Sequence, residues 1–77
     1  MLTQRRILVI DDEARMCDSI RSLLMPWGYY VETASSGREG IDKLNSDEFQ
    51  VVVTDIKMED GSGYDVMAHI QQNYPET

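Results

Sequence analysis

Residues 51–63 read VVVTDIKMEDGSG, in which an apolar run of strand length stops at Asp55 and a loop rich in acids and glycine follows. The same arrangement occurs earlier, where ILVI at 7–10 runs directly into Asp11 and Asp12. Continuous apolar runs are typical of parallel strands that helices cover on both faces. The two stretches therefore predict two buried strands, each of which ends in an acidic residue.

The rest of the chain alternates between strand and helix patterns. Strands are predicted at three segments rich in apolar, β-branched or aromatic residues, namely 5–11, 29–34 and 49–54. Helices are predicted at 14–25 before Pro26, from Ser36 to about 45–46, and from Ser62 to Tyr74 before Pro75. Strands that alternate with helices indicate a parallel sheet with right-handed crossovers. The chain of 77 residues then forms one small α/β domain over 1–77.

Each predicted helix carries apolar residues that we expect to face the sheet. The three sets are Met16, Ile20, Leu23 and Leu24; Ile41 and Leu44; and Val66, Met67 and Ile70. The second helix is expected to begin with a capping box, in which Ser36 accepts a hydrogen bond from a free amide while Glu39 reaches back. For Met16 a core position and a docking surface for a partner both remain open.

Composition restricts the partners that the chain can bind. The formal net charge is −7, from 14 acidic and 7 basic residues, which argues against nucleic acid and against an anionic membrane surface. No segment approaches the roughly 20 apolar residues of a membrane span. Cys17 is the only cysteine, so we predict a small core residue, no internal disulfide and a cytoplasmic location. An acidic chain suits a cation or a partner with a basic patch.

Three acids are predicted to converge at one edge of the sheet. Ligands of such sheets bind outside the carboxyl ends of the strands, and Asp11, Asp12 and Asp55 all follow a strand there. Close carboxylates repel one another, and Mg²⁺ relieves that repulsion because it prefers six oxygen ligands. Taken singly, Asp11 or Asp12 could instead cap a helix and Asp55 could form a turn. Together they favour a metal site.

The segments ILVIDDEARM, VVVTDIKM and SGYDVM resemble, in order and spacing, the receiver domain of bacterial response regulators. The resemblance covers essentially the whole chain, and DIKM followed by DGSG is most similar to the branch that controls sigma-54-dependent transcription activators. It implies a flavodoxin-like, doubly wound sheet of strand order 2-1-3-4-5. Only the first β-α-β-α-β-α portion, of order 2-1-3, is found in this chain, without the last two strands and helices.

The resemblance also implies a role for each acid. Asp55 would be the phosphoacceptor, taking a phosphoryl group from a sensor histidine kinase or phosphotransfer protein. Asp12 would bind Mg²⁺ directly, Asp11 mainly through water, and Lys57 through its backbone carbonyl. Such a domain passes a signal to an effector, and as an enzyme it does no more than phosphorylate itself and slowly dephosphorylate itself.

The chain departs from the family pattern in two ways. Glu59 stands where the family usually has a proline, which adds charge near the site and loosens the loop. The absent portion would supply a hydroxyl residue and a lysine that hold the phosphoryl group. Without it the strand 49–54 becomes an open, uncharged edge, which predicts either a fragment or a homo-oligomer formed through that edge.

Two other functions remain open at this point. One is a receiver-like interaction or dimerisation module that is never phosphorylated. The other is a phosphotransfer enzyme of the haloacid dehalogenase type, which also places a nucleophilic aspartate after an apolar strand. That enzyme class has a second aspartate two residues later, where this chain has Lys57.

Overall fold

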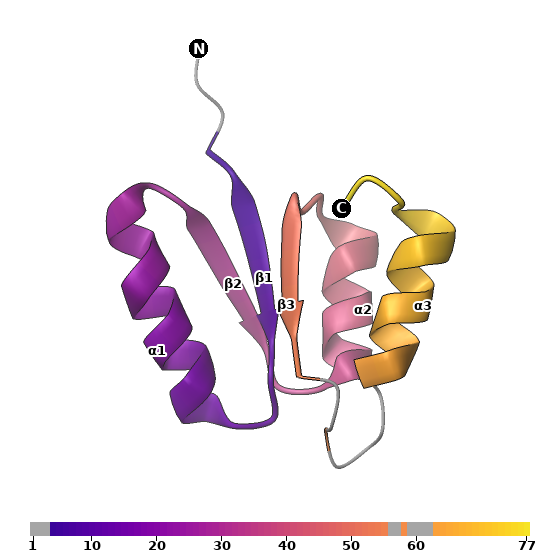
Figure 1. Ribbon diagram of the computed structural model, residues 1–77, viewed down its shortest axis with the longest axis horizontal. Helices are drawn as coiled ribbons and strands as arrows, with labels where there is room; N and C mark the ends of the chain where they lie inside the picture. Colours follow the sequence, from indigo (N-terminus) through magenta and orange to yellow (C-terminus); the bar gives the residue numbers. More distant parts are fainter. Residues whose placement is uncertain (1–3, 56–57, 59–62) are drawn as a thin grey trace.

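A single parallel sheet lies between two helical layers in the computed structural model, which describes residues 4–55, 58 and 63–77 (Figure 1). The strands β1 (Arg6–Ile10), β2 (Tyr30–Ala34) and β3 (Val51–Thr54) are arranged in the order β2-β1-β3. Helix α1 (Ala14–Leu24) covers one face, and α2 (Gly37–Ser46) and α3 (Gly63–Asn73) cover the other. This confirms the predicted doubly wound arrangement of order 2-1-3.

The central strand β1 is the most deeply buried element. It pairs in parallel with both neighbours, so that Ile7 lies opposite Val31 and Val51, while Ile10 lies opposite Ala34 and Thr54. Residues 7–10 are all buried, as the continuous apolar run predicted. Because β1 and β3 are neighbours in the same direction, their carboxyl ends meet at one edge of the sheet.

The two faces of the sheet carry separate cores. The core on the α2–α3 side consists of Leu8, Ile10, Ala34, Leu44, Phe49, Met58 and Val66, with Ile41 and Ile70 packed against it. The core on the α1 side consists of Ile7, Val9, Cys17 and Val31, with Ile20 and Leu24 packed against it. The inward residues predicted for the second helix are confirmed, as are Val66 and Ile70 in the third and the core position of Cys17.

Three residues predicted to face the core do not. Met16 is 44% exposed, Leu23 is 67% exposed and Met67 is 41% exposed. In α1 the inward face runs through Cys17, Ile20 and Leu24, because the helix is turned so that the thiol rather than the thioether meets the sheet. Met16 is therefore a surface residue, which resolves the two interpretations of this position.

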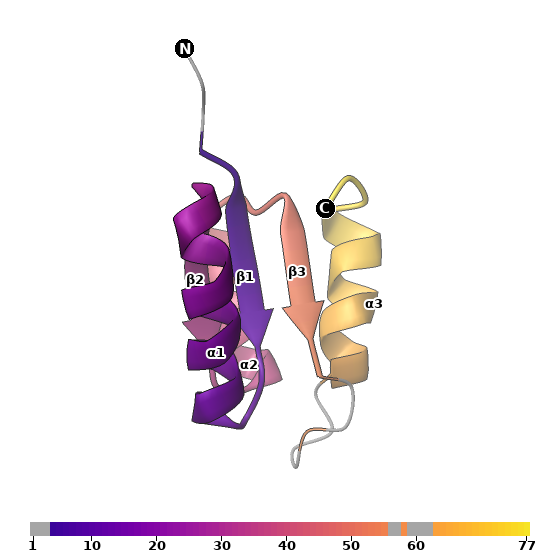
Figure 2. The same cartoon turned by 60° about the vertical axis from the view of Figure 1, so that its left-hand side comes forward.

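The third strand is shorter than predicted, and among the described residues one of its faces lacks the helix that was expected to cover it. It begins at Val51 rather than at 49. The Gln50 N–H donates to the Arg6 carbonyl (2.9 Å), but the Arg6 N–H donates to the Gln50 side-chain Oε1 (2.7 Å) and not to a backbone carbonyl of the strand. Val51 and Val53 are 45% and 40% exposed, so the prediction that this strand is covered on both faces is wrong. Figure 2 shows the reason, since α1 lies over β1 and β2 and leaves β3 uncovered on that face among the described residues.

The helix ends agree with the sequence signals where the structure describes them. The Glu39 N–H donates to Ser36 Oγ (3.1 Å), and Glu39 Oε1 in turn accepts a hydrogen bond from the Ser35 N–H (2.8 Å). A short 3₁₀ helix, η1 (Met25–Trp27), contains Pro26 and ends α1, and Gly28 follows it with a φ of 91°. The predicted cap at Ser62 lies outside the described residues.

Candidate metal site

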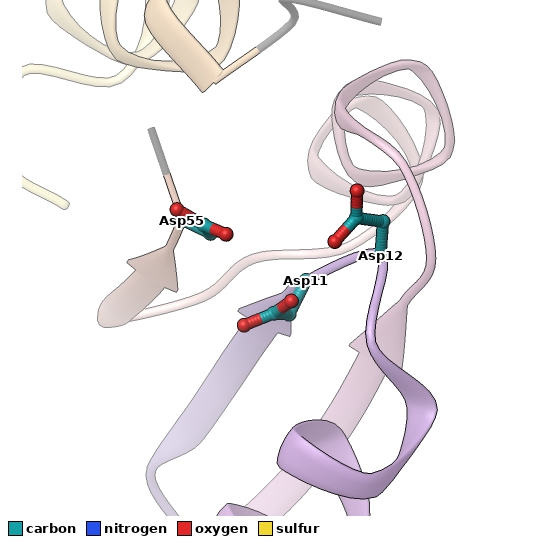
Figure 3. A group of neighbouring side chains, drawn as sticks. All are labelled: Asp11, Asp12 and Asp55. Carbon is teal, nitrogen blue, oxygen red and sulfur yellow. The ribbon is translucent and has the colours of Figure 1, made fainter. Parts of the chain in front are cut away.

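Three carboxylates gather at the carboxyl edge of the sheet, where Asp11 and Asp12 follow β1 and Asp55 follows β3 (Figure 3). One oxygen from each side chain lies within 4.8 Å of the other two. Asp11 and Asp55 are half-buried and Asp12 is exposed, so the cluster opens to solvent on the Asp12 side. The structure thus brings together the three acids that the sequence placed at this edge.

Backbone hydrogen bonds hold the cluster on the sheet. The Asp55 N–H donates to the Ile10 carbonyl (3.0 Å), which ties the end of β3 to the end of β1. The Asp11 N–H donates to the Ala34 carbonyl (3.0 Å), which ties the same point to the end of β2. Asp11 and Asp55 are therefore fixed by their backbones to the ends of the described strands.

Asp11 also has a local structural role. Its Oδ1 accepts a hydrogen bond from the Glu13 N–H (2.9 Å), which forms the turn between β1 and α1. The N-cap of α1 is Glu13, which makes no side-chain cap of its own. The alternative that Asp11 or Asp12 is the N-cap of the first helix is therefore wrong, although one carboxylate oxygen of Asp11 holds the turn that precedes the helix.

The donor set fits a hard divalent cation of the size of Mg²⁺. All three groups offer carboxylate oxygen, the ligand that Mg²⁺ prefers. Oxygens on opposite sides of a six-coordinate Mg²⁺ lie about 4.2 Å apart, given metal–oxygen distances of about 2.1 Å. The observed limit of 4.8 Å is slightly wider, so small side-chain shifts would bring the three oxygens into one shell, whose other positions would be left for further ligands such as water.

Cys17 lies directly beneath the cluster, and the sequence did not assign it to the site. Its Sγ lies 3.5 Å from the Asp11 carbonyl oxygen and 3.8 Å from that of Ala34. Burial raises the pKa of the Cys17 thiol, and the negative charge of Asp11 raises it further. The thiol stays protonated at neutral pH and donates weakly to the backbone that carries Asp11. The sequence feature that could have assigned Cys17 to the site is its position in the helix that begins soon after Asp11.

One predicted site residue, Lys57, whose carbonyl was expected to complete the site, lies outside the described residues, as does Glu59. Met58 is buried in the core on the α2–α3 side. Lys43 donates from Nζ to the Thr33 carbonyl (2.7 Å) and lies 3.6 Å from Glu32. No helix in the part of the chain that the structure describes is long and apolar enough to cross a membrane.

Comparisons with known proteins agree on one family. The family model described as the response regulator receiver domain matches residues 7–77. The transcriptional regulatory protein ZraR of Escherichia coli is 33% identical over 69 residues, which cover 90% of this chain and 16% of ZraR. The probable transcriptional regulator ycf27 of Guillardia theta is 34% identical over 71 residues, which cover 92% of this chain and 28% of that protein.

Solved structures show the same likeness. The response regulator TrrA of Thermotoga maritima, in complex with Mg(2+)-BeF, superposes with a TM-score of 0.87 at 33% identity, over 94% of this chain and 63% of that one. A receiver domain from Clostridium thermocellum superposes with a TM-score of 0.81 at 41% identity, over 92% of this chain and 58% of that one. The chain thus spans about three fifths of these solved chains and a much smaller part of the curated relatives.

Proposed function

The chain belongs to the response regulator receiver domain family, and on that premise we propose that it is a phosphoacceptor of two-component signalling that uses Mg²⁺. The observation that carries the proposal is the convergence of Asp11, Asp12 and Asp55 within 4.8 Å at the carboxyl edge of the sheet. Asp55 is the acceptor, and the donor is a sensor histidine kinase or a phosphotransfer protein. The family match favours this function over a phosphotransfer enzyme of the haloacid dehalogenase type.

Each residue of the site has a separate role in the proposed phosphoryl transfer. A carboxylate oxygen of Asp55 attacks the phosphorus of the donor phosphohistidine, an O–P bond forms, the P–N bond breaks, and the imidazole leaves with a proton on its other nitrogen. Asp12 would hold the metal directly beside Asp55, and Asp11 would hold it mainly through water. Mg²⁺, when bound, neutralises charge that would otherwise repel the incoming phosphoryl group. The backbone carbonyl of Lys57 is the fourth proposed ligand.

Phosphorylation at this position is a large local change in charge. An acyl phosphate carries roughly −1.5 to −2 charges where the carboxylate carried −1, so the site gains up to about one further negative charge together with the bulk of the phosphoryl group. That charge appears where the carboxyl ends of β1 and β3 meet, so it can bias the elements that contact them. Because the named relatives are transcriptional regulators, we propose a cytoplasmic effector that controls transcription as the recipient of the signal.

An intact-mass measurement tests the proposal. The purified protein is incubated with a small acyl-phosphate donor, with Mg²⁺ or with a chelator, beside the variants Asp55→Asn and Glu76→Gln. The expected result is a gain of one phosphoryl group that requires Mg²⁺, occurs in Glu76→Gln and is absent from Asp55→Asn. Folded protein that gains no phosphoryl group, or Asp55→Asn protein that gains one, would contradict the proposal.

A second candidate function is assembly through the open edge of β3 without phosphorylation. The observation that favours it is the exposure of Val51 and Val53 on a strand that has a neighbour on only one side in the described part of the chain. Asp55→Asn separates the two functions, because it removes the phosphoacceptor and leaves the edge unchanged.

A further inference from the structure

The strand β2 forms an outer edge of the sheet. Among the described strands it pairs with β1 on one side only. In the order 2-1-3-4-5 that the family resemblance implies, further strands would lie beyond β3, so β2 would be an edge of that larger sheet as well. An edge strand presents backbone N–H and C=O groups with which another chain can pair. The side chains along β2 therefore decide which strands can pair there.

A groove of about 370 Å³ follows this edge. The five consecutive residues 29–33 line it, which gives it a length of about 13 Å at 3.3 Å per residue. Arg21 of α1 and Met25 of η1 line it from one face of the sheet, and Lys43 of α2 lines it from the other. A groove that runs along a strand and is open to both faces of the sheet suits an extended chain better than a compact small molecule.

The backbone of β2 offers hydrogen bonds to a chain in this groove. The Tyr30 N–H donates to the Arg5 carbonyl (2.8 Å), so the backbone groups of Tyr30 face β1. Because these directions alternate along a strand, Val31 and Thr33 direct their backbone groups away from β1. The hydrogen bond from Lys43 Nζ to the Thr33 carbonyl (2.7 Å) agrees with that direction. Val31 is thus the residue with which an added strand can pair without disturbing Lys43.

The surroundings of the groove are basic although the chain is acidic overall. Four of the seven basic residues, Arg5, Arg6, Arg21 and Lys43, lie along β2 or line the groove, whereas the formal net charge is −7. Glu32 also lines the groove, but it lies 3.0 Å from Arg6 and 3.6 Å from Lys43, so its charge is balanced. Arg21 forms no ion pair within the described residues. The groove therefore offers a cation on each face of the sheet.

From this combination we propose that the β2 edge binds an extended acidic segment of a partner protein, which adds to the sheet as a further strand. Main-chain hydrogen bonds to Val31 contribute affinity, and the cations Arg21 and Lys43 select carboxylates. The site uses none of the three acids at the carboxyl edge, so it goes beyond the proposed phosphoacceptor function and does not depend on it.

Lys43 determines which strands the edge admits. A lysine on an edge strand ordinarily keeps other strands away. Here its ammonium group occupies the Thr33 carbonyl, so a neutral strand that extends past Val31 has to displace the ammonium group without replacing its contact. A strand with a carboxylate at this point offers the ammonium group a charged partner instead. The same lysine thus excludes neutral strands and accepts acidic ones.

The two cations also restrict the spacing of the acids in the bound segment. Successive side chains of a strand point to opposite faces of the sheet. Two adjacent acids therefore reach Arg21 on one face and Lys43 on the other, whichever of them comes first. Acids two positions apart lie on the same face and reach only one of the two cations. The proposal predicts a preference for adjacent acids.

NMR titration of the full ¹⁵N-labelled chain with two blocked synthetic peptides tests this preference. The first peptide is Thr-Val-Glu-Glu-Val-Thr, and the second is Thr-Glu-Val-Glu-Val-Thr, which has the same composition and charge. Both should cause saturable shifts of the amide signals of residues 29–33, and the first should bind about threefold more tightly because it makes one more ion pair. The first sequence with glutamine at both acidic positions should bind more weakly than either.

Matched variants assign the effect to the two cations. Arg21→Gln and Lys43→Gln should each weaken binding of the first peptide about threefold and abolish its advantage over the second. Arg38→Gln removes the same charge from an exposed residue of α2 that does not line the groove, and should leave both affinities unchanged. The dispersion of the amide signals verifies that each variant is folded.

Several outcomes would overturn the inference. Folded protein whose signals at residues 29–33 do not move with either peptide would exclude the binding site. Tighter binding of the first peptide by Lys43→Gln would mean that Lys43 only keeps strands away from the edge. Equal binding of the glutamine peptide, or equal weakening by Arg38→Gln, would exclude selection by the two cations. None of these results affects the phosphoacceptor function, which the mass measurement tests separately.

Discussion

Replacing Asp55 with asparagine should stabilise the metal-free protein, although it removes the proposed phosphoacceptor. The cluster oxygens lie within 4.8 Å of one another, and two unit charges at that distance repel by about 1 kcal/mol in bulk water. Asp55 takes part in two of the three pairs, so the substitution relieves about 2 kcal/mol at low ionic strength. Screening with a Debye length of about 8 Å at physiological salt reduces this to about 1 kcal/mol.

The assay is thermal and urea unfolding in the presence of a chelator, at low and at physiological salt. A gain of 1 kcal/mol raises the midpoint of thermal unfolding by about 4–8 °C in a domain of this size. The control is Glu76→Gln, which removes the same charge from an exposed residue near the C-terminus, outside the cluster.

Magnesium should reverse the order of stability. Ligand binding at a concentration of 100 times the dissociation constant stabilises the native state by about 2.7 kcal/mol, and Asp55→Asn should lose most of that gain because it removes one of the acids. The reasoning would be refuted if the metal-free Asp55→Asn protein were no more stable than the wild type at low salt. It would also be refuted if Glu76→Gln gained as much, because the effect would then come from net charge.

Three further predictions concern the elements that carry the site. Gly40→Ala would place a Cβ against Ile10 Cδ1 and 2.8 Å from Ile10 Cγ1, so we expect overpacking of about 1–3 kcal/mol to outweigh a helix gain of about 1 kcal/mol in urea unfolding. Ile10→Val removes Cδ1 and keeps the γ carbons, so it should relieve part of this overpacking in the double variant. Ser36→Ala should cost about 1 kcal/mol in the same assay, since the cap to the Glu39 N–H is lost. In the folded protein the pKa of the Cys17 thiol lies above its ordinary value of 9.0. The protonated thiol therefore contributes its full stabilisation below pH 9.0, and that contribution is lost as the pH rises through the folded-state pKa. The stability difference between wild type and Cys17→Ala should therefore shrink at alkaline pH; a difference that grows there would reverse the assigned direction.

The sheet and the convergence of the acids follow from local signals in the sequence. The apolar run at 7–10 and the valines before Asp55 are strand signals that need no tertiary information, and parallel strands place the residues that follow them at one edge. The order β2-β1-β3 then brings Asp11 and Asp55 together. This part of the site could be predicted because topology leaves few alternatives.

The orientation of the helices could not be predicted in the same way. The predicted stripe of Met16, Ile20, Leu23 and Leu24 includes two residues that the structure exposes, Met16 and Leu23. Cys17, which was predicted separately as a core residue, joins Ile20 and Leu24 on the true inward face. Periodicity identifies an amphipathic helix, and the shape of the opposing surface selects which residues are buried.

Whether a helix covers each face of β3 could not be predicted from the sequence of the strand itself. Three consecutive valines and a threonine indicate a strand, but the exposure of a strand depends on which other elements lie over it. In the described residues α1 spans β1 and β2 only, so Val51 and Val53 remain exposed. The exposure of this face of β3 was not predicted from the sequence.

The most direct test of the central claim is to locate the acceptor of the phosphoryl group. The protein is phosphorylated with an acyl-phosphate donor and Mg²⁺ and then treated with hydroxylamine, which converts an acyl phosphate into a stable hydroxamate at the same carboxyl group. Peptide fragmentation by mass spectrometry then identifies the modified residue. The account predicts a hydroxamate on Asp55 that depends on Mg²⁺ and is lost in Asp12→Asn. A hydroxamate on another carboxylate, or the same yield at Asp55 without the metal, would contradict it.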